Sequence, residues 1–117
     1  MKAIVELGRR GAAIGRARAQ LANARAGKNA DYHLVFESIK TLFSELTPAR
    51  IDTLKHLRAM GHVSIYQLAK TMHRNYSNVH RDVEKLIEHR LVEKDPDDLV
   101  FSPWDSVEIR VDLAQAA

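Results

Sequence analysis

Two short amphipathic segments separated by a break of three polar residues constrain this chain most. The first begins at Ser64, a favourable N-cap residue, and Gln67 three positions later can complete a capping box. Val63 and Leu68 have the spacing of a hydrophobic staple across the same helix start. The apolar residues of the segment recur on one helical face: Ile65, Leu68, Ala69 and Met72. We therefore predict a helix that begins at Ser64 and ends before His73.

The second segment follows directly after the polar break, and Asn75 can cap it. Its apolar residues repeat at spacings of three and four: Tyr76, Val79, Val83, Leu86 and Ile87. Two short helices joined by so tight a turn cross at a steep angle, as in a helix-turn-helix motif. Ala69 belongs at their closest approach, because a larger side chain there would separate them. We expect the second helix to extend over residues 75–89.

A β-hairpin is predicted after the second helix. Residues 91–94 and 99–101 flank the run Asp-Pro-Asp-Asp at 95–98, and an Asp-Pro start suits a type I turn. The expected fold class is therefore α+β, mainly α: a winged helix-turn-helix. Three carboxylates at the hairpin tip should be repelled by a phosphate backbone. We expect this wing to be structural and to stay out of the minor groove.

The outward face of the second helix is the candidate interface for a partner. If Val79 and Val83 point to the core, the first two turns present no acidic side chain outward, because Asp82 lies nearer the buried edge. Asn can bond adenine bidentately, Arg can bond guanine, and a helix N-terminus favours phosphate oxygens. We therefore predict a nucleic-acid interface in which Asn78 and Arg81 read bases.

The predicted DNA-binding set extends beyond these two base readers. Ser77 and Arg74 are expected to contact phosphate, whereas Arg50, in the first turn of the preceding helix, could reach a phosphate or simply be solvated. Tyr76 shares the apolar stripe, so burial in the core is its favoured interpretation, and His80 lies on the flank. Any one of these residues could belong to a solvated polar face, and the prediction depends on the constellation. The complete set is Arg50, Arg74, Asn75, Tyr76, Ser77, Asn78, His80, Arg81 and Lys85.

Four runs of this sequence resemble the MarR-like winged helix-turn-helix transcriptional regulators of prokaryotes. They are Leu46–Arg50, Ser64–Ala69, Asn75–Val83 and Leu91–Glu93. The resemblance covers about residues 36–113, and the segment Asn-Val-His-Arg-Asp-Val is its most specific part. Relatives usually have Gly before the Leu-Val-Glu strand, where this chain has Arg90. Because a non-Gly residue in a left-handed position costs about 1 kcal/mol, we expect the helix to end differently here.

The resemblance implies DNA binding, usually as a homodimer. We expect a sequence-specific transcriptional regulator, acting as a repressor, that reads the major groove of double-stranded DNA with residues 75–89. Some members of the family look like antitoxins encoded beside a small toxin. The alternative is therefore an antitoxin that represses its own operon and binds a toxin through its N-terminal extension. A third interpretation is an interaction module that binds protein or RNA.

The N-terminal extension, residues 1–31, carries most of the positive charge. Residues 1–33 hold seven Lys or Arg against two acids, whereas residues 34–117 hold eleven against thirteen. We predict a strand over residues 3–7, a turn from Gly8 to Gly11 and a helix over residues 12–26 that ends at Gly27. Its partner could be a second subunit, DNA phosphate or a toxin. The alternative is a purely structural role, in which the helix docks on the protein and its arginines are solvated.

The remaining elements of the predicted 32–113 domain follow from periodicity. Alternation predicts a strand at residues 32–36, and Ser38 caps a helix whose buried face is Ile39, Leu42, Phe43 and Leu46. Thr47 at the N-cap and Pro48 at N1 begin a helix that lasts until Gly61. Trp104 is expected to cover an edge of the core. A last strand, residues 107–113, needs a partner strand at 3–7 or 32–36, within one chain or between two, and residues 114–117 should be frayed.

Composition and spacing argue against most chemistry. With no cysteine, disulfides and thiolate metal sites are excluded, and the six histidines offer no i, i+4 pair. Gly8, Gly11 and Gly15 lack the residues that complete a phosphate loop or a dinucleotide fingerprint. We expect no enzyme activity, metal or cofactor. A hydrophobic content of 45% suffices for a compact core, and no apolar run is long enough to span a membrane. A soluble cytoplasmic protein is the natural expectation.

Overall fold

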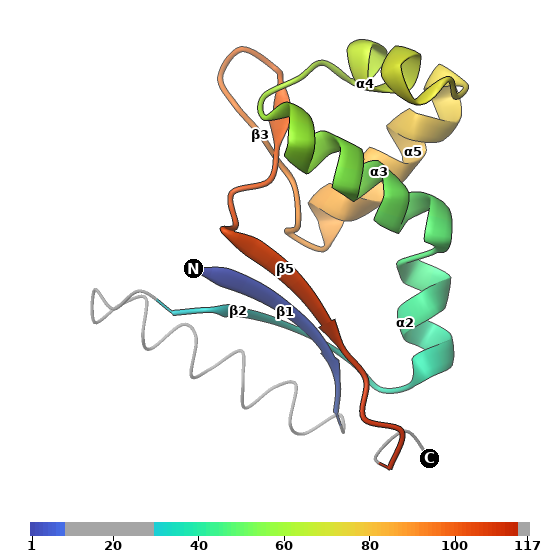
Figure 1. The fold of residues 1–117 in the computed structure, drawn as a ribbon, viewed down its shortest axis with the longest axis vertical. Coiled ribbons are helices and arrows are strands. Elements are labelled where there is room, and N and C mark those ends of the chain that lie inside the picture. Colours follow the sequence, from blue (N-terminus) through green and yellow to red (C-terminus); the bar gives the residue numbers. More distant parts are fainter. Residues whose placement is uncertain (9–29, 115–117) are drawn as a thin grey trace. The chain divides into compact units, whose positions relative to one another are not determined.

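The structure of this 117-residue chain is a computed structural model, and it describes residues 1–8 and 30–114 (Figure 1). These residues form an α+β fold with two compact units, one made of residues 1–44 and 104–117 and the other of residues 45–103. The division expected at residue 31 stays a prediction, and in the structure strands from both sides of that residue join one sheet. The predicted helix at 12–26 and the tail after 114 lie outside the described residues.

The first unit contains a three-stranded parallel sheet in the order β2-β1-β5. Its strands are β1 (Lys2–Leu7), β2 (Tyr32–Phe36) and β5 (Ser106–Arg110). The C-terminal strand pairs with the N-terminal one within the chain, which is one of the two partners predicted, and it ends at Arg110 instead of Leu113. Ala3, Ile4 and Val5 in the central strand are all buried. Because successive side chains point to opposite faces of a sheet, both faces of β1 are covered.

Contacts at the ends of the strands hold this unit together. The rings of Tyr32 and Trp104 stack with centroids 5.3 Å apart, so the half-buried Trp104 covers the start of β2. The backbone N–H of Lys2 donates to Asp31 Oδ1 at 2.9 Å, and the N-terminal amine pairs with Asp105. The chain segments that enter β2 and β5 are thereby anchored beside β1.

Helix α2 (Ile39–Glu45) begins as predicted, because Ser38 Oγ accepts from the backbone N–H of Thr41 at 3.1 Å. Leu42 is buried, as is Leu46 directly after the helix, but Phe43 is 42% exposed. Its placement on the buried face was wrong: Ile39, Leu42 and Leu46 already define the stripe, and Phe43 falls at its border.

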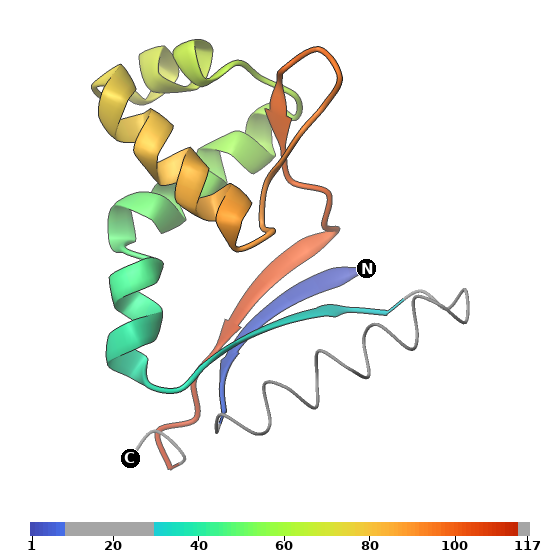
Figure 2. The same ribbon diagram turned by 180° about the vertical axis from the view of Figure 1, so that it is seen from behind.

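The second unit begins with three helices, all of which start where the capping residues predicted. They are α3 (Pro48–Met60), α4 (Ile65–Met72) and α5 (Tyr76–Glu88). Their N-cap side chains, Thr47, Ser64 and Asn75, accept from the backbone N–H three residues later. Helix α5 packs against both α3 and α4, as Figure 2 shows from behind. The core of the unit includes Leu57, Leu68, Ala69, Val79, Val83 and Leu86.

A hairpin completes the second unit, with strands shorter than predicted: β3 (Glu93–Lys94) and β4 (Val100–Phe101) are antiparallel. Val63 adds a bridge, because its backbone donates to and accepts from Val100 at 3.1 and 2.8 Å. The segment before α4 thus lies beside the hairpin. The turn forms at the Asp-Pro start, where the N–H of Asp98 donates to the carbonyl of Asp95 at 3.0 Å.

The end of α5 corrects one expectation. Arg90 has φ 63°, so it adopts the left-handed conformation that favours glycine. Its N–H donates to the carbonyl of Ile87, and the N–H of Leu91 donates to that of Leu86 at 3.0 Å, which is the hydrogen-bond pattern of a Schellman motif. Leu91 is fully buried. We conclude that burial of this leucine and the two hydrogen bonds hold Arg90 in a conformation that costs about 1 kcal/mol.

None of the helices in the described part of the chain has both the length and the apolar character needed to cross a membrane.

Candidate nucleic-acid interface

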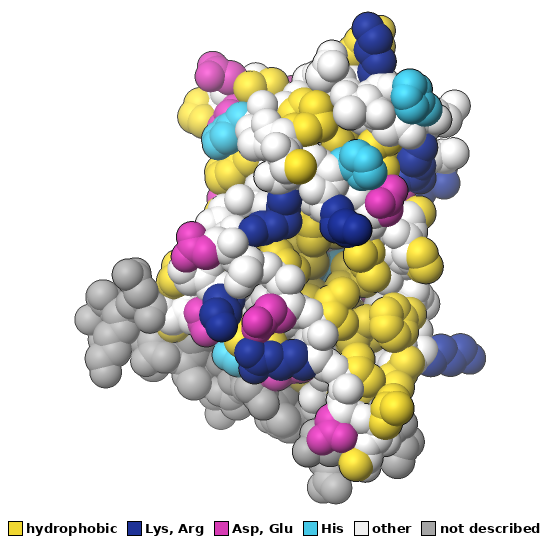
Figure 3. Space-filling view, viewed as in Figure 1, with side chains coloured by type: hydrophobic (Ala, Val, Ile, Leu, Met, Phe, Trp, Pro, Cys, Tyr) yellow, Lys and Arg dark blue, Asp and Glu magenta, His cyan; other side chains and the backbone are white. Residues whose placement is uncertain are grey.

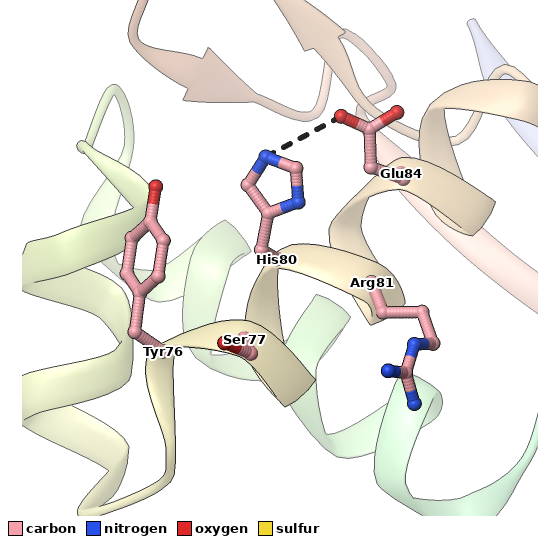
Figure 4. A pocket seen from close by; sticks show the side chains of 5 residues that line it. All are labelled: Tyr76, Ser77, His80, Arg81 and Glu84. Atoms are coloured by element: carbon pink, nitrogen blue, oxygen red, sulfur yellow. Dashed lines mark ion pairs between the residues drawn. The ribbon is translucent and has the colours of Figure 1, made fainter.

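The N-terminal half of α5 presents an open concavity on its outward face. It has a volume of about 420 Å³ and is lined by five side chains from three successive turns: Tyr76, Ser77, His80, Arg81 and Glu84. Figure 4 shows Tyr76, His80 and Glu84 projecting in one direction from the helix and Arg81 projecting in another. We call this surface the α5 concavity. Because it is open and shallow, it suits the edge of a larger partner better than an enclosed small molecule.

Three polar side chains at the start of α5 are free to meet a partner. Ser77, Asn78 and Arg81 are exposed, and none of them forms a side-chain hydrogen bond or an ion pair within the part of the chain that the structure describes. Only the backbone N–H of Asn78 is engaged, by the Asn75 cap at 3.3 Å. The sequence predicted these residue types for the first two turns. Ser77 and Arg81 line the α5 concavity, whereas Asn78 is exposed on the same helix but is not among the lining residues.

Tyr76 belongs to this surface too, which corrects its interpretation as a core residue. It is 49% exposed, and its ring lies 5.8 Å from that of His80 in a tilted arrangement. Tyr76 is the first residue of α5 and lies at the N-terminal end of its apolar stripe. Full burial begins one turn later, at Val79. An exposed aromatic next to a partly exposed histidine gives the concavity an apolar wall.

Two arginines of the predicted set face inward instead. Arg50 Nε lies 3.2 Å from Asp82 Oδ1, and Arg74 Nη2 lies 2.9 Å from Asp82 Oδ2. A second nitrogen of each guanidinium is also occupied, since Arg50 Nη1 donates to the carbonyl of Glu45 and Arg74 Nη1 to the hydroxyl of Thr53, each at 2.9 Å. We call these residues the Asp82 cluster. Their side chains link the helices, so Arg50 and Arg74 have a structural role, and their contact with phosphate stays a prediction.

The cluster was visible in the sequence only in part. Asp82 was placed near the buried edge of the second helix, and the structure leaves it just 7% exposed between two valines of the core stripe. A carboxylate at such a position is rarely buried without a paired cation. That rule could have directed attention to arginines elsewhere in the chain, but it could not say that Arg50 on α3 and Arg74 in the turn before α5 approach.

Lys85 is the third predicted residue with other partners. Its Nζ lies 3.8 Å from Glu45 and 3.3 Å from Glu88, and its side chain is 35% exposed. Of the two acids that follow the first two turns of α5, Glu88 therefore engages this lysine. In the same turns Glu84 lies 3.5 Å from His80 Nε2, close enough to pair with a protonated imidazole.

Two exposed residues of α4 were not included in the predicted DNA-binding set. Tyr66 is 66% exposed and Lys70, one turn later, is exposed as well. Both lie outside the apolar stripe of their helix, and that position is the signal that could have revealed them. A tyrosine hydroxyl and a lysine ammonium are common donors to phosphate oxygens.

The charge of the second unit is balanced. Residues 45–103 hold nine Lys or Arg and nine Asp or Glu. Figure 3 likewise shows basic, acidic and histidine side chains interspersed on the face that it presents. No group of three or more His, Cys, Asp or Glu residues in the described ranges could hold a metal ion. Any binding of polyanions must therefore come from a few well-placed groups.

The hairpin tip exposes two carboxylates instead of the three expected, because the side chain of Asp95 turns back into the hairpin. Its side chain is 13% exposed, and Oδ1 accepts from the backbone N–H groups of Asp97 and Leu99 at 2.8 and 3.0 Å. Its Oδ2 lies 2.7 Å from Nδ1 of His62, whose ring stacks on that of Phe101 at 4.2 Å. The hydrogen bond from His62 and those from the backbone lower the pKa of Asp95. Asp97 and Asp98 remain exposed.

This lowered pKa predicts how acid affects the hairpin. A carboxyl group whose pKa is lower in the folded state adds stability above its unfolded pKa, near 3.8, and loses it as the pH falls through the folded value. We expect Asp95→Asn to be less stable than the parent at pH 7 and the difference to shrink below about pH 4. Urea unfolding followed by circular dichroism between pH 7 and pH 3 measures this. Asp97→Asn should retain the parent's pH dependence; an equal response of both variants would contradict the assignment.

Comparison with known proteins gives one family and no individual relative. The family model HVO_A0114 matches residues 45–109, more than half of the chain. The match spans α3, α4, α5, the hairpin and most of β5. No curated protein and no solved structure matches this sequence.

Proposed function

The chain belongs to the HVO_A0114 family, and we propose that its second unit is a winged helix-turn-helix that binds double-stranded DNA. One observation carries this proposal. Ser77, Asn78 and Arg81 are exposed together on the first two turns of α5 and are not engaged by other described side chains. Exposed polar side chains are common on any solvated surface, but an asparagine and an arginine on the first turns of the second helix of such a pair are the groups that can read base edges.

The order of elements supports this assignment. Helices α4 and α5 are joined by His73, Arg74 and Asn75, and His73 takes the left-handed conformation that ends α4, with φ 54°. The N–H of Arg74 donates to the carbonyl of Ala69, so the turn is fixed by the backbone. A two-stranded hairpin follows α5, in the place of a wing. In proteins of this architecture the second helix enters the major groove with its N-terminal residues against base edges.

Each exposed residue then has a role that its chemistry permits. Arg81 can donate two hydrogen bonds to guanine, and Asn78 can pair with adenine. Ser77, together with the free N–H groups of the first turn of α5, suits a phosphate oxygen. Tyr76 and His80 would lie against sugar or the methyl group of thymine. The remaining phosphate contacts come from Tyr66 and Lys70 on α4.

We further propose that DNA binding serves transcriptional regulation, with the protein acting as a repressor. A module of this size that reads a few base pairs can block a promoter by occupancy alone. The resemblance to MarR-like regulators favours this role. The alternative is toxin binding through the N-terminal extension, residues 1–31, of which residues 9–29 lie outside the described residues.

Selection of tight-binding duplexes from a random pool tests the proposal, with footprinting on the protein's own promoter as a second readout. We expect enrichment of a short preferred sequence. Because the second unit carries no net charge, few phosphates should be neutralised. For each phosphate contact, the logarithm of the affinity should fall by about 0.9 for every tenfold increase in salt concentration. A pool that shows no enrichment, together with an affinity independent of salt, would exclude DNA binding.

A further inference from the structure

The outer edge of β5 ends the parallel sheet without a further strand among the described residues. The sheet order is β2-β1-β5, and Figure 1 shows β5 at the side of the sheet away from β2. An edge strand presents a row of unpaired N–H and C=O groups that can accept another strand. Natural proteins usually blunt such edges with proline, bulges or inward-pointing charges. The sequence of β5, Ser-Val-Glu-Ile-Arg, contains neither proline nor a lysine.

Apolar surface is also exposed at this edge. Val107 and Ile109 lie in register with Ala3 and Val5 of the central strand, so all four side chains share one face of the sheet. Ala3 and Val5 are fully buried, whereas Ile109 is 39% exposed. The apolar layer thus stops at Ile109 with part of that side chain in water.

The charged residues of β5 occupy the opposite face. Arg110 Nη2 lies 2.7 Å from Glu108 Oε2, and Lys2 on β1 lies 3.9 Å from the other oxygen of Glu108. Glu108 and Arg110 are symmetrically placed about Ile109, one on each side. This arrangement is self-complementary when the strand is turned by a two-fold axis.

We propose that β5 pairs antiparallel with β5 of a second copy of this chain, with the two-fold axis at Ile109. In this register Glu108 lies opposite Arg110 of the second copy and Arg110 opposite its Glu108, so the charges on the face form two cross-strand pairs. Val107 lies opposite Val111 and Ile109 opposite itself, which extends the apolar layer across the axis. The result is one six-stranded sheet with closed two-fold symmetry.

The charges select this register over its neighbours. An axis at residue 108 would place two glutamates directly opposite each other, and an axis at residue 110 would do the same with two arginines; like charges in such positions are destabilising. If the register of the two strands changed by one residue, the apolar side chains of one copy would lie on the same face as the charged side chains of the other. Only the axis at Ile109 satisfies both faces.

Charge exchange tests the pairing without DNA, so its outcome is independent of the proposed function. The parent is expected to sediment as a dimer at micromolar concentrations. Glu108→Arg alone sets arginines opposite arginines, and Arg110→Glu alone sets glutamates opposite glutamates. Each variant should weaken self-association at least about tenfold. An equimolar mixture of the two variants should form a heterodimer, identified by its mass in native mass spectrometry, because every cross-strand pair is then of opposite charge.

The mixture separates pairing between chains from effects on folding. In each single variant the ion pair within β5 is lost, and mixing does not restore it, so recovered association can come only from contacts between copies. Glu37→Arg and Lys40→Glu change the same charges at exposed positions of the first unit and should dimerise as the parent does. A monomeric parent at about 100 µM, single variants that dimerise like the parent, or a mixture that stays monomeric would each overturn the proposal.

Discussion

Replacement of Arg50 with methionine is expected to lower the free energy of unfolding of the second unit by about 3 kcal/mol. The carboxylate of Asp82 is buried in the apolar stripe of α5, and each of its oxygens is bonded to one guanidinium group. Methionine keeps the apolar stem of the side chain but removes the charge that faces Oδ1. Loss of one partner of a buried ion pair costs roughly 3–5 kcal/mol, and Arg74 keeps the effect near the lower end. Urea unfolding followed by circular dichroism at pH 7 gives the value.

Two further variants determine whether Asp82 causes the loss. In Arg50→Met/Asp82→Leu the buried charge is gone together with its partner, so the double variant should be more stable than the sum of the single changes predicts, by on the order of 1–2 kcal/mol. Lys55→Met removes an exposed cation from the same helix and should change stability by less than about 0.5 kcal/mol. If Arg50→Met were as stable as Lys55→Met, the cluster would not be a stabilising contact.

The helix starts of the second unit could be predicted because their cause is local. Thr47, Ser64 and Asn75 each satisfy a backbone N–H only three residues away, so the information lies within one turn of sequence. The turn at Asp95 is local in the same way. Periodicity likewise fixed the buried side of α4 and α5, since a stripe at spacings of three and four has one way to face a core.

The arrangement of the strands could not be predicted so fully. Alternation indicated strands at both ends of the chain, but β1 pairs with β5 across about 100 residues of sequence, and nothing local specifies which of two candidate strands lies in the centre. Whether two strands share a sheet is a property of the packed fold.

The candidate site shows the same division. Ser77, Asn78 and Arg81 are exposed as the helical period required, because each lies opposite a buried valine or leucine of the same helix. Arg50 and Arg74 differ, since an arginine outside the stripe may be solvated or may reach back to a buried acid on another helix. Which of these two occurs depends on the positions of the helices relative to one another. The periodicity within one helix carries no information about those positions.

Arg81→Ala is expected to weaken binding to the selected duplex by about 5- to 150-fold, which corresponds to the roughly 1–3 kcal/mol of a bidentate contact with guanine. The guanidinium of Arg81 forms no ion pair with the residues that the structure describes, so its removal should leave the free energy of unfolding within about 0.5 kcal/mol of the parent. Preference should be lost at one base pair and retained at the others. Fluorescence anisotropy with the selected duplex and its single-base-pair variants measures both effects.

The same titrations with two lysine variants distinguish base contact from phosphate contact. Lys70→Ala should weaken binding to every duplex alike and reduce the slope of log affinity against log salt by about 0.9. Lys55→Ala, which removes an exposed cation on α3, serves as the control for net charge. If Arg81→Ala behaved like Lys70→Ala, the arginine would contact phosphate and base recognition would have to come from Asn78. If it bound all duplexes as the parent does, the α5 concavity would not face DNA, because Arg81 is one of the side chains that line it.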